Sequence, residues 1–447
     1  MQTTEERRLT IVRLTSKNNG TNVIQKLLFG YRFTVLTLMN TFVVIVFLNV
    51  ILFAIFSVRD HYSQDPVSAK YGHQYVSLVY PGLSQSEIYA LLKETWSRAY
   101  IYDPFTQFKE RPYRGTYVNV DVNGYRRTKD QGTWPPLSSR LNIFLFGGST
   151  IFGYGVSDDQ TVATYLQASL ETKLGHRVSV YNFGRGHYYS TQERILYESI
   201  LASGFIPDVA IFVDGLNDFF YNTNEPIFTT RFHEFVSNEP LVQLRFHEFV
   251  SKGDAISKGD ASDSVIGFIS KTSIGRAVRK IKQSLSKSLQ EDTHTKRLAE
   301  HTKETLNNHD KYADPKVADV VINRYLNNKK LIEAVSKAFG VTPIFVWQPV
   351  PTYHYDQRYH LFSEGGYGQH SYSSYGYERM AKVIEVSPLD NNFLWLADIQ
   401  KDKTEPLYVD KFHYSARFSK QFAIAIADLL IERSLIPMRE NVSQISN

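Results

Sequence analysis

The pattern of hydrophobic and polar positions first separates one long apolar stretch from the rest of the chain. Residues 33–58 contain no charged side chain and consist mainly of Val, Leu, Ile, Phe and Met. These 26 residues exceed the ~20 that a helix needs to cross a bilayer. A buried core helix usually has polar residues at a period of 3.6, and a cleavable signal peptide has a shorter apolar run before small residues. The pattern therefore predicts an uncleaved transmembrane anchor.

The charges on either side of this stretch predict its orientation. Six basic residues precede it within residues 1–32, whereas Arg59 is nearly alone just after it; the six are Arg7, Arg8, Arg13, Lys17, Lys26 and Arg32. Basic residues stay preferentially on the cytoplasmic side of a membrane. No later segment is apolar and long enough to cross again. We therefore expect a single-pass protein of the inner (cytoplasmic) membrane, with a cytoplasmic N-terminus and a periplasmic or otherwise extracytoplasmic domain.

A regular alternation of strand-like and helix-like segments occupies residues 139–436. Short apolar runs predict strands at 142–146, 177–183, 208–213, 342–347 and 393–399. Amphipathic segments predict helices at 161–174, 191–203, 315–339 and 415–435. Alternation of this kind is typical of a parallel sheet covered by helices on both faces. The fold class predicted for this region is α/β.

Three segments do not follow the alternation. Residues 59–138 are turn-rich after a possible helix at 84–100 and are predicted to be an N-terminal extension or linker. Residues 221–314 form an insertion in which the sequence Arg-Phe-His-Glu-Phe-Val-Ser occurs twice. A helix with a basic face within the insertion is typical of a cap helix, although such a face can also rest on a membrane. Residues 437–447 are predicted to be a C-terminal tail.

Composition removes several classes of protein. The absence of Cys excludes a disulfide scaffold, a thiolate zinc site, an iron–sulfur protein and a cysteine nucleophile. The 50 basic and 45 acidic residues give a net charge of +5, too mild to favour nucleic acid as the main partner. The two His-Glu pairs lack the second His of a zincin, and there is no Gly-Lys phosphate loop. We expect no metal and no organic cofactor.

Two short segments after predicted strands carry glycines and a candidate nucleophile. Gly147-Gly-Ser149-Thr150 follows the first strand, where a tight turn exposes the Ser hydroxyl and aims its N–H at a developing oxyanion. Asn182 to Gly186 follows the second strand, and its glycines allow close approach of the backbone. Each segment taken alone is more typical of a plain strand–helix turn.

Two further segments carry an amide and a possible proton-transfer pair. Gly215-Leu-Asn217-Asp218 follows the third strand, and an Asn there can donate to an oxyanion or form an Asx turn. Asp410-Lys-Phe-His413 precedes the last helix; the carboxylate can orient the imidazole while its other nitrogen takes a proton from Ser. A lone Asp-x-x-His has no special meaning.

The order and context of the four segments together resemble the SGNH hydrolase superfamily, the GDSL-type esterases and lipases. The resemblance covers about residues 139–436. It implies a flavodoxin-like three-layer sandwich with Ser149 as nucleophile, His413 as base and Asp410 as its orienting partner. It also implies an oxyanion hole made by the Ser149 N–H, the Asn217 side chain and a glycine N–H of the second segment.

The sequence departs from the superfamily pattern at two places. The first segment reads Gly-Gly-Ser-Thr where many members have Gly-Asp-Ser-Leu. Many members also place the glycine of the second segment five residues after the Asn, and this position is His187 here. The N–H of Gly186 is therefore the predicted oxyanion donor, and the N–H of Gly184 is the alternative.

These observations predict a membrane-anchored, exported serine esterase that hydrolyses acyl esters, O-acetyl esters above all, on envelope or secreted polysaccharide. A lipid ester is an alternative substrate. Two other functions stay open: an O-acyltransferase with the same triad, and a non-catalytic subunit of an envelope complex. Protein partners are not predicted.

Two further features have alternative interpretations. Seven tyrosines between residues 353 and 377 could line a sugar cleft or pack a surface loop on the core. Trp347-Gln348-Pro349 could border the site or simply end a strand.

Overall fold

The computed structural model describes residues 4–62, 67–68, 72–98, 100–221, 277, 312–364 and 366–437. The chain divides into two units, one holding the N-terminal helix and the other holding the described residues from 67 to 221 and from 312 to 437. The duplicated sequence, the proposed cap helix and most of the predicted insertion lie outside the described residues, as does the tail beyond residue 437.

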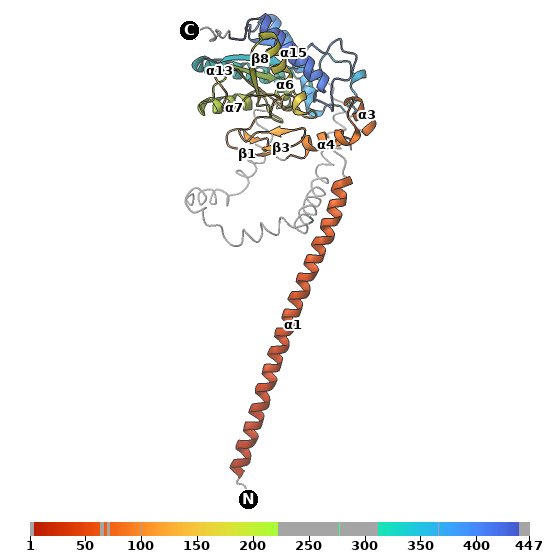
Figure 1. Cartoon of the computed structure of the whole chain (residues 1–447), viewed down its shortest axis with the longest axis vertical. Helices are drawn as coiled ribbons and strands as arrows, with labels where there is room; N and C mark the ends of the chain where they lie inside the picture. The colour runs from red at the N-terminus through yellow and green to blue at the C-terminus, as the bar shows by residue number, and fades with distance from the viewer. Residues whose placement is uncertain are drawn as a thin grey trace, which may run out of the picture. The chain divides into compact units, whose positions relative to one another are not determined.

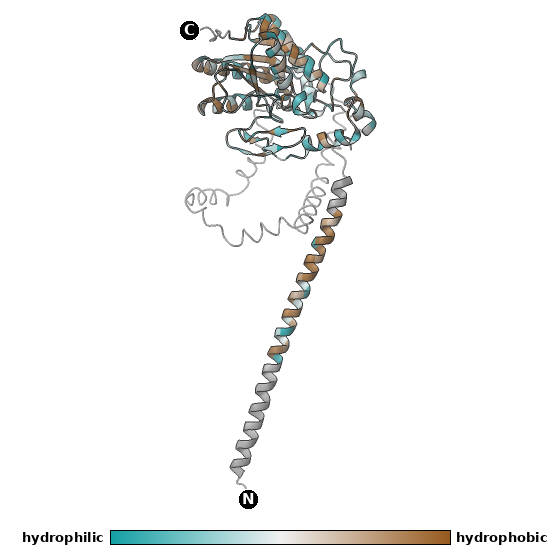
Figure 2. Cartoon of the chain, viewed as in Figure 1, coloured by the Kyte–Doolittle hydropathy of each residue, from teal (hydrophilic) through white to brown (hydrophobic). Residues whose placement is uncertain are grey.

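The first unit contains α1, which runs over Thr4–Tyr62. Its segment Lys26–Ile55 is long and apolar enough to cross a membrane, and none of its most apolar window is buried within the protein. Figure 2 shows this apolar stretch in brown along the helix. The structure thus confirms one apolar N-terminal helix that contains the predicted span, while its orientation stays a prediction.

The second unit is built on a five-stranded parallel sheet (Figure 1). Its strands are ordered β6-β5-β7-β8-β9 and comprise β5 (Leu141–Gly147), β6 (Val178–Asn182), β7 (Val209–Asp214), β8 (Thr342–Trp347) and β9 (Phe393–Trp395). The predicted α/β class is confirmed. The last strand is shorter than predicted because it pairs with β8 over only three positions.

Helices cover both faces of the sheet, which gives three layers. One face packs against α7 (Ser190–Ala202), α13 (Pro315–Phe339) and α14 (Tyr372–Val386), and the other against α6 (Val162–Leu174) and α15 (Ala416–Glu432). A hydrophobic core lies on each face of the sheet, and alternate residues of β5 pack into each of them. Phe144 and Phe146 belong to one core, and Ile143 and Leu145 belong to the other. This double burial explains why the strands read as continuous apolar runs.

Short elements connect the layers at the carboxyl ends of the strands. They are α5 (Ser149–Phe152), α8 (Leu216–Phe220) and the 3-10 turns Asp158–Gln160, Gln357–Tyr359 and Gly368–Ser371. The carboxyl edge of such a sheet is the usual place for a ligand.

The predicted N-terminal extension packs on the sheet domain. It contains α3 (His73–Leu78), α4 (Gln85–Trp96), the hairpin of β1 (Ile101–Asp103) and β2 (Gln107–Lys109), and the pair of β3 (Tyr113–Arg114) and β4 (Asn119–Val120). Ser84 and Glu87 form a capping box that starts α4. The predicted boundary between residues 138 and 139 therefore falls inside one compact unit.

Candidate active site

The predicted nucleophile lies on a tight turn between β5 and α5. The strand ends at Gly147, and Ser149 is the first residue of the short helix. A Cβ atom at Gly148 would lie 2.5 Å from Nδ2 of Asn217, so a larger residue would displace this amide. Glycine at position 148 thus allows the first and third predicted segments to approach each other closely.

The three predicted catalytic residues form one hydrogen-bonded chain. His413 Nε2 lies 2.8 Å from Ser149 Oγ, and His413 Nδ1 lies 2.7 Å from Asp410 Oδ2. Asp410 and His413 are each 7% exposed, and Ser149 is half-buried. These distances suit proton transfer from a hydroxyl to an imidazole whose tautomer is fixed by a carboxylate.

The loop that holds Asp410 also keeps its carboxylate ionised. Oδ1 accepts the N–H groups of Phe412 and His413, both at 2.9 Å, so the carboxylate fixes its own loop. Burial alone would raise the pKa of Asp410, but the charge and hydrogen bond of His413, together with these N–H groups, outweigh burial and lower that pKa. The carboxylate is therefore available to orient His413 at neutral pH.

The second predicted segment wraps around the nucleophile turn. Asn182 Nδ2 donates to the carbonyl of Ile151 at 2.8 Å, and the Arg185 N–H donates to the carbonyl of Gly147 at 2.9 Å. The Gly184 N–H donates to Asn182 Oδ1 at 3.0 Å, and the Gly186 N–H donates to Glu110 Oε1 at 3.2 Å. Both N–H groups considered as oxyanion donors therefore already have an acceptor in this structure.

The third segment brings its amide to the same turn. Asn217 Nδ2 donates to the Tyr188 carbonyl at 2.7 Å, and because an amide nitrogen carries two hydrogens, a second donor remains. His187, five residues after Asn182, has a φ of 63°, the left-handed conformation that glycine adopts most readily. The chain thus keeps a glycine-like turn at this position without the glycine.

Gln348 links the nucleophile side of the site to the base side. Its Oε1 accepts from Thr150 Oγ1 at 2.7 Å and from the Tyr414 hydroxyl at 3.0 Å. These partners are the direct neighbours of Ser149 and His413. Of the alternatives for Trp347-Gln348-Pro349, Gln348 thus borders the site, while Trp347 is fully buried in the core.

The extension and the turn after α5 contribute residues that sequence reasoning missed. The Tyr154 ring stacks on His413 at 5.3 Å, and Trp96 of α4 meets His413 edge-on at 5.5 Å. Glu110 accepts from the Tyr154 hydroxyl at 2.9 Å and pairs with Arg98 at 3.0 Å. Tyr154 lies five positions after Ser149, whereas Trp96, Arg98 and Glu110 belong to the extension, far from the four segments. No motif marks any of these side chains.

A buried acidic cluster lies behind the Asn217 turn. Asp218 accepts from Ser190 Oγ at 2.6 Å and from the Gly215 N–H at 3.2 Å, which fixes the start of α8. Glu193 and Asp214 are almost completely buried beside it. Burial, with the charges of Asp214 and Asp218, raises the pKa of Glu193 well above its ordinary value, and burial with Asp218 raises that of Asp214 likewise.

This cluster predicts a pH dependence of stability. An acid whose pKa is raised by folding binds its proton more tightly in the folded state, so stability falls as pH rises from the ordinary pKa of 4.5 for Glu193 towards the raised one. We expect the Tm of the full chain in detergent to fall between pH 5 and pH 8, and Glu193→Gln to reduce that fall. Glu198→Gln, on the exposed side of α7, is the matched control. An equal fall in wild type and Glu193→Gln would contradict this prediction.

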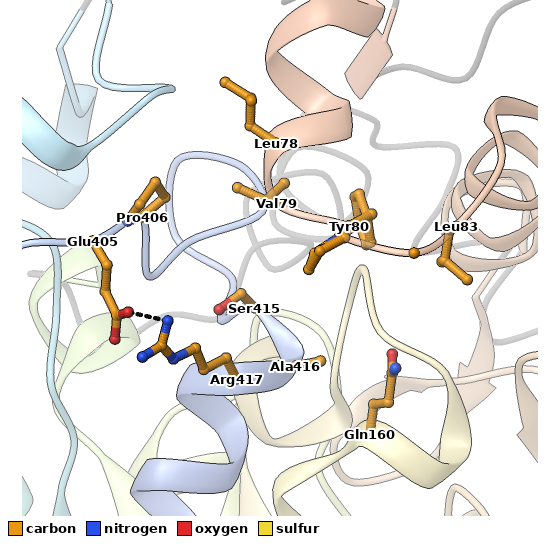
Figure 3. A pocket seen from close by; sticks show the side chains of 12 residues that line it. Leu78, Val79, Tyr80, Leu83, Gln160, Glu405, Pro406, Ser415, Ala416 and Arg417 are labelled. Atoms are coloured by element: carbon orange, nitrogen blue, oxygen red, sulfur yellow. Dashed lines mark ion pairs between the residues drawn. The ribbon is translucent and has the colours of Figure 1, made fainter.

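Not every pocket of this unit belongs to the site. A cavity of about 300 Å³ lies between residues 78–83 of the extension and the start of α15, and Figure 3 shows the side chains that line it. The Arg417–Glu405 ion pair lies at its wall, and Ser415 uses its side chain to cap α15. None of the three triad residues lines this cavity.

Comparisons with known proteins concern the fold. No family model and no curated protein matches the chain. A solved lipolytic protein of the G-D-S-L family from Desulfitobacterium hafniense DCB-2 is 12% identical, with 65% of this chain and 100% of that chain covered and a TM-score of 0.30. The acetyl xylan esterase AlAXEase is 11% identical, with 64% and 98% covered and a TM-score of 0.30. The α/β hydrolase LAE5 from the Lake Arreo metagenome is 11% identical, with 68% and 99% covered and a TM-score of 0.29.

Proposed function

We propose that this protein is a serine esterase, held at a membrane by α1, that removes short acyl groups from exported or envelope polysaccharide. The observation that carries the proposal is the chain of hydrogen bonds from Ser149 through His413 to Asp410. A hydroxyl, a neutral imidazole and an ionised carboxylate in this order are the groups that acyl transfer to serine requires.

In the first half of the proposed reaction, Ser149 Oγ attacks the ester carbonyl carbon as His413 Nε2 takes the hydroxyl proton. The oxyanion that forms accepts from the Ser149 N–H and from the second hydrogen of Asn217 Nδ2. The bond to the alcohol oxygen then breaks, and His413 returns the proton to that oxygen. Water repeats these steps on the acyl-serine and restores Ser149.

In this proposal the third oxyanion donor is the N–H of His187 and not that of Gly186, which the sequence predicted. The Gly186 N–H donates to Glu110, and the Gly184 N–H donates to Asn182. His187 has the left-handed backbone that suits the glycine of the resembled superfamily at this position. Its N–H therefore takes the role predicted for Gly186.

Crowding around His413 supports a short acyl group. The rings of Trp96 and Tyr154 contact His413, and a Cβ atom at Gly186 would lie only 2.1 Å from the Tyr100 hydroxyl. These aromatic side chains leave little room beside the base, which favours acetyl over a long acyl chain.

Hydrolysis of p-nitrophenyl acetate by the full chain in detergent tests the proposal. We expect turnover by the wild type and at least about a 10³-fold loss in Ser149→Ala, because the nucleophile is removed. Ser203→Ala, on the exposed end of α7, is the matched control and should keep wild-type activity. Equal rates in wild type and Ser149→Ala would overturn the proposal. Transfer of the acetyl group to an added sugar hydroxyl, with little release to water, would instead assign the acyltransferase.

A further inference from the structure

A groove lined by tyrosines lies beside the catalytic loop. Its volume is about 630 Å³, within the usual range of ligand sites. The side chains that line it include Tyr312, Gln357, Tyr367, Ser374, Tyr375 and Glu378. It is bordered by the start of α14, the turn Gly368–Ser371 before it and the residues that precede α13.

The tyrosine-rich stretch of the sequence divides between core and groove. Tyr353, Tyr355 and Tyr377 are buried, which fits the packing interpretation for these three residues. Tyr367 and Tyr375 are half-buried and line the groove. The packing interpretation thus holds for the three buried tyrosines, and a sugar cleft stays a prediction for the two that line the groove.

The wall of the groove contacts the loop that carries the catalytic base. The Tyr367 ring lies 5.8 Å from that of Phe412, and the His370 ring lies 4.2 Å from it. Phe412 is the direct neighbour of His413. Lys411 Nζ also donates to the carbonyl of Gly366, which ties the same wall to the catalytic loop.

The same wall contacts the loop that carries the oxyanion amide. His370 packs against Phe220 of α8 with ring centroids 4.5 Å apart, and α8 also holds Asn217. Burial and the charges of His187 and His413 lower the pKa of His370 to about 3, so its ring is neutral at neutral pH. The wall of the groove therefore contacts both loops of the reaction centre, through the His370 ring and through the hydrogen bond of Lys411 to Gly366, while no triad residue lines the groove itself.

The lining has the chemistry of a site for neutral sugars. Tyrosine rings offer flat apolar faces with a polar edge, and the serine and tyrosine hydroxyls can both donate and accept. The Gln357 amide is already hydrogen-bonded: its oxygen accepts from the Tyr367 hydroxyl and its nitrogen donates to the Pro351 carbonyl. Among the lining residues that the structure describes, Glu378 is the one charged side chain. A carboxylate accepts sugar hydroxyls but repels an anionic chain.

We propose that this groove binds the uncharged glycan chain that carries the ester, so that Tyr367 and Tyr375 select a polymeric substrate for Ser149. This inference rests on the proposed esterase function and specifies its substrate. A small ester should make no use of the groove, whereas an acetylated oligosaccharide should depend on it.

Kinetics with two substrates test the groove. The substrates are p-nitrophenyl acetate and O-acetylated xylohexaose, the enzyme is the full chain in detergent, and the variants are Tyr367→Ala and Tyr375→Ala. We expect each variant to raise KM for the oligosaccharide about tenfold, as the loss of about 1.4 kcal/mol of binding would do. The rate with p-nitrophenyl acetate should change less than about twofold in Tyr375→Ala. Because the Tyr367 ring packs on Phe412 beside His413, Tyr367→Ala is judged by the ratio of its losses on the two substrates. Tyr75→Ala, an exposed tyrosine on α3, is the matched control.

A direct titration separates failure of the groove from failure of the esterase. Calorimetry of Ser149→Ala with xylohexaose should give binding that Tyr375→Ala weakens in the same background, and tri-galacturonate should not bind. No xylohexaose binding, preferential binding of the anionic chain, or equal losses on both esters would overturn the groove proposal. If the wild type cleaves neither ester while the titration still shows the tyrosine-dependent binding, the esterase function fails and the glycan site stands.

Discussion

Replacing Asp410 with asparagine is expected to lower kcat for ester hydrolysis about 10⁴-fold while the protein stays folded. Asparagine keeps an oxygen that can accept the N–H groups of Phe412 and His413, so the loop is retained. Its amide nitrogen, however, would face His413 Nδ1 and donate to it. The imidazole proton would then lie on Nε2, which could no longer accept the proton of Ser149 Oγ.

The measurement is kcat with p-nitrophenyl acetate, alongside thermal unfolding of the same preparation. A Tm close to that of the wild type, together with the loss of kcat, would assign the effect to the tautomer. Asp398→Asn is the matched control, because Asp398 pairs with the exposed His354 in the same kind of contact at 2.5 Å. If Asp410→Asn lowers kcat by less than about tenfold, the result would contradict a triad in which Asp410 orients the base.

Replacing Glu110 with alanine is expected to destabilise the second unit by about 3–5 kcal/mol. Glu110 and Arg98 form an ion pair whose side chains are only 3% and 2% exposed. Removal of the carboxylate would leave a buried guanidinium charge without this partner. It would also remove the acceptor of the Tyr154 hydroxyl and of the Gly186 N–H.

Scanning calorimetry of the full chain measures this effect as a fall in Tm. Glu198→Ala is the control, because Glu198 pairs with Arg194 at the surface of α7 and such pairs contribute at most about 1 kcal/mol. The fall in Tm for Glu110→Gln should lie between those of Glu110→Ala and Glu198→Ala, since glutamine keeps a neutral acceptor. Equal Tm values for Glu110→Ala and Glu198→Ala would show that the extension does not hold the site in this way.

The sheet and its helices were predictable because burial on both faces leaves a strong pattern in the sequence. The segment that became β5 is a short, continuous apolar run followed by glycines, and the segment that became α15 has the amphipathic period of a helix. Helix ends followed from local chemistry, as where Asp314 caps α13 and Pro315 occupies its first position. The whole of α14 was not predicted, because its polar, tyrosine-rich first turn lacks a clear apolar face.

Residues of the site were predictable only where a short motif carries them. Ser149, Asn217 and His413 lie next to strand ends or a helix start, and their order along the chain is informative. Trp96 and Glu110 reach the same centre through tertiary packing, which no local pattern records. The hydrogen bond from the Gly186 N–H could not be predicted either, because its acceptor, Glu110, lies 76 positions earlier in the chain.

Labelling with a fluorophosphonate tests the central claim, an activated Ser149, most directly. The reagent phosphonylates a serine whose hydroxyl is deprotonated by a neighbouring base. We predict one adduct on the full chain in detergent, located on Ser149 by peptide mass spectrometry and lost in both Ser149→Ala and His413→Ala. No adduct on the folded wild type, or an adduct that persists in His413→Ala, would contradict the account.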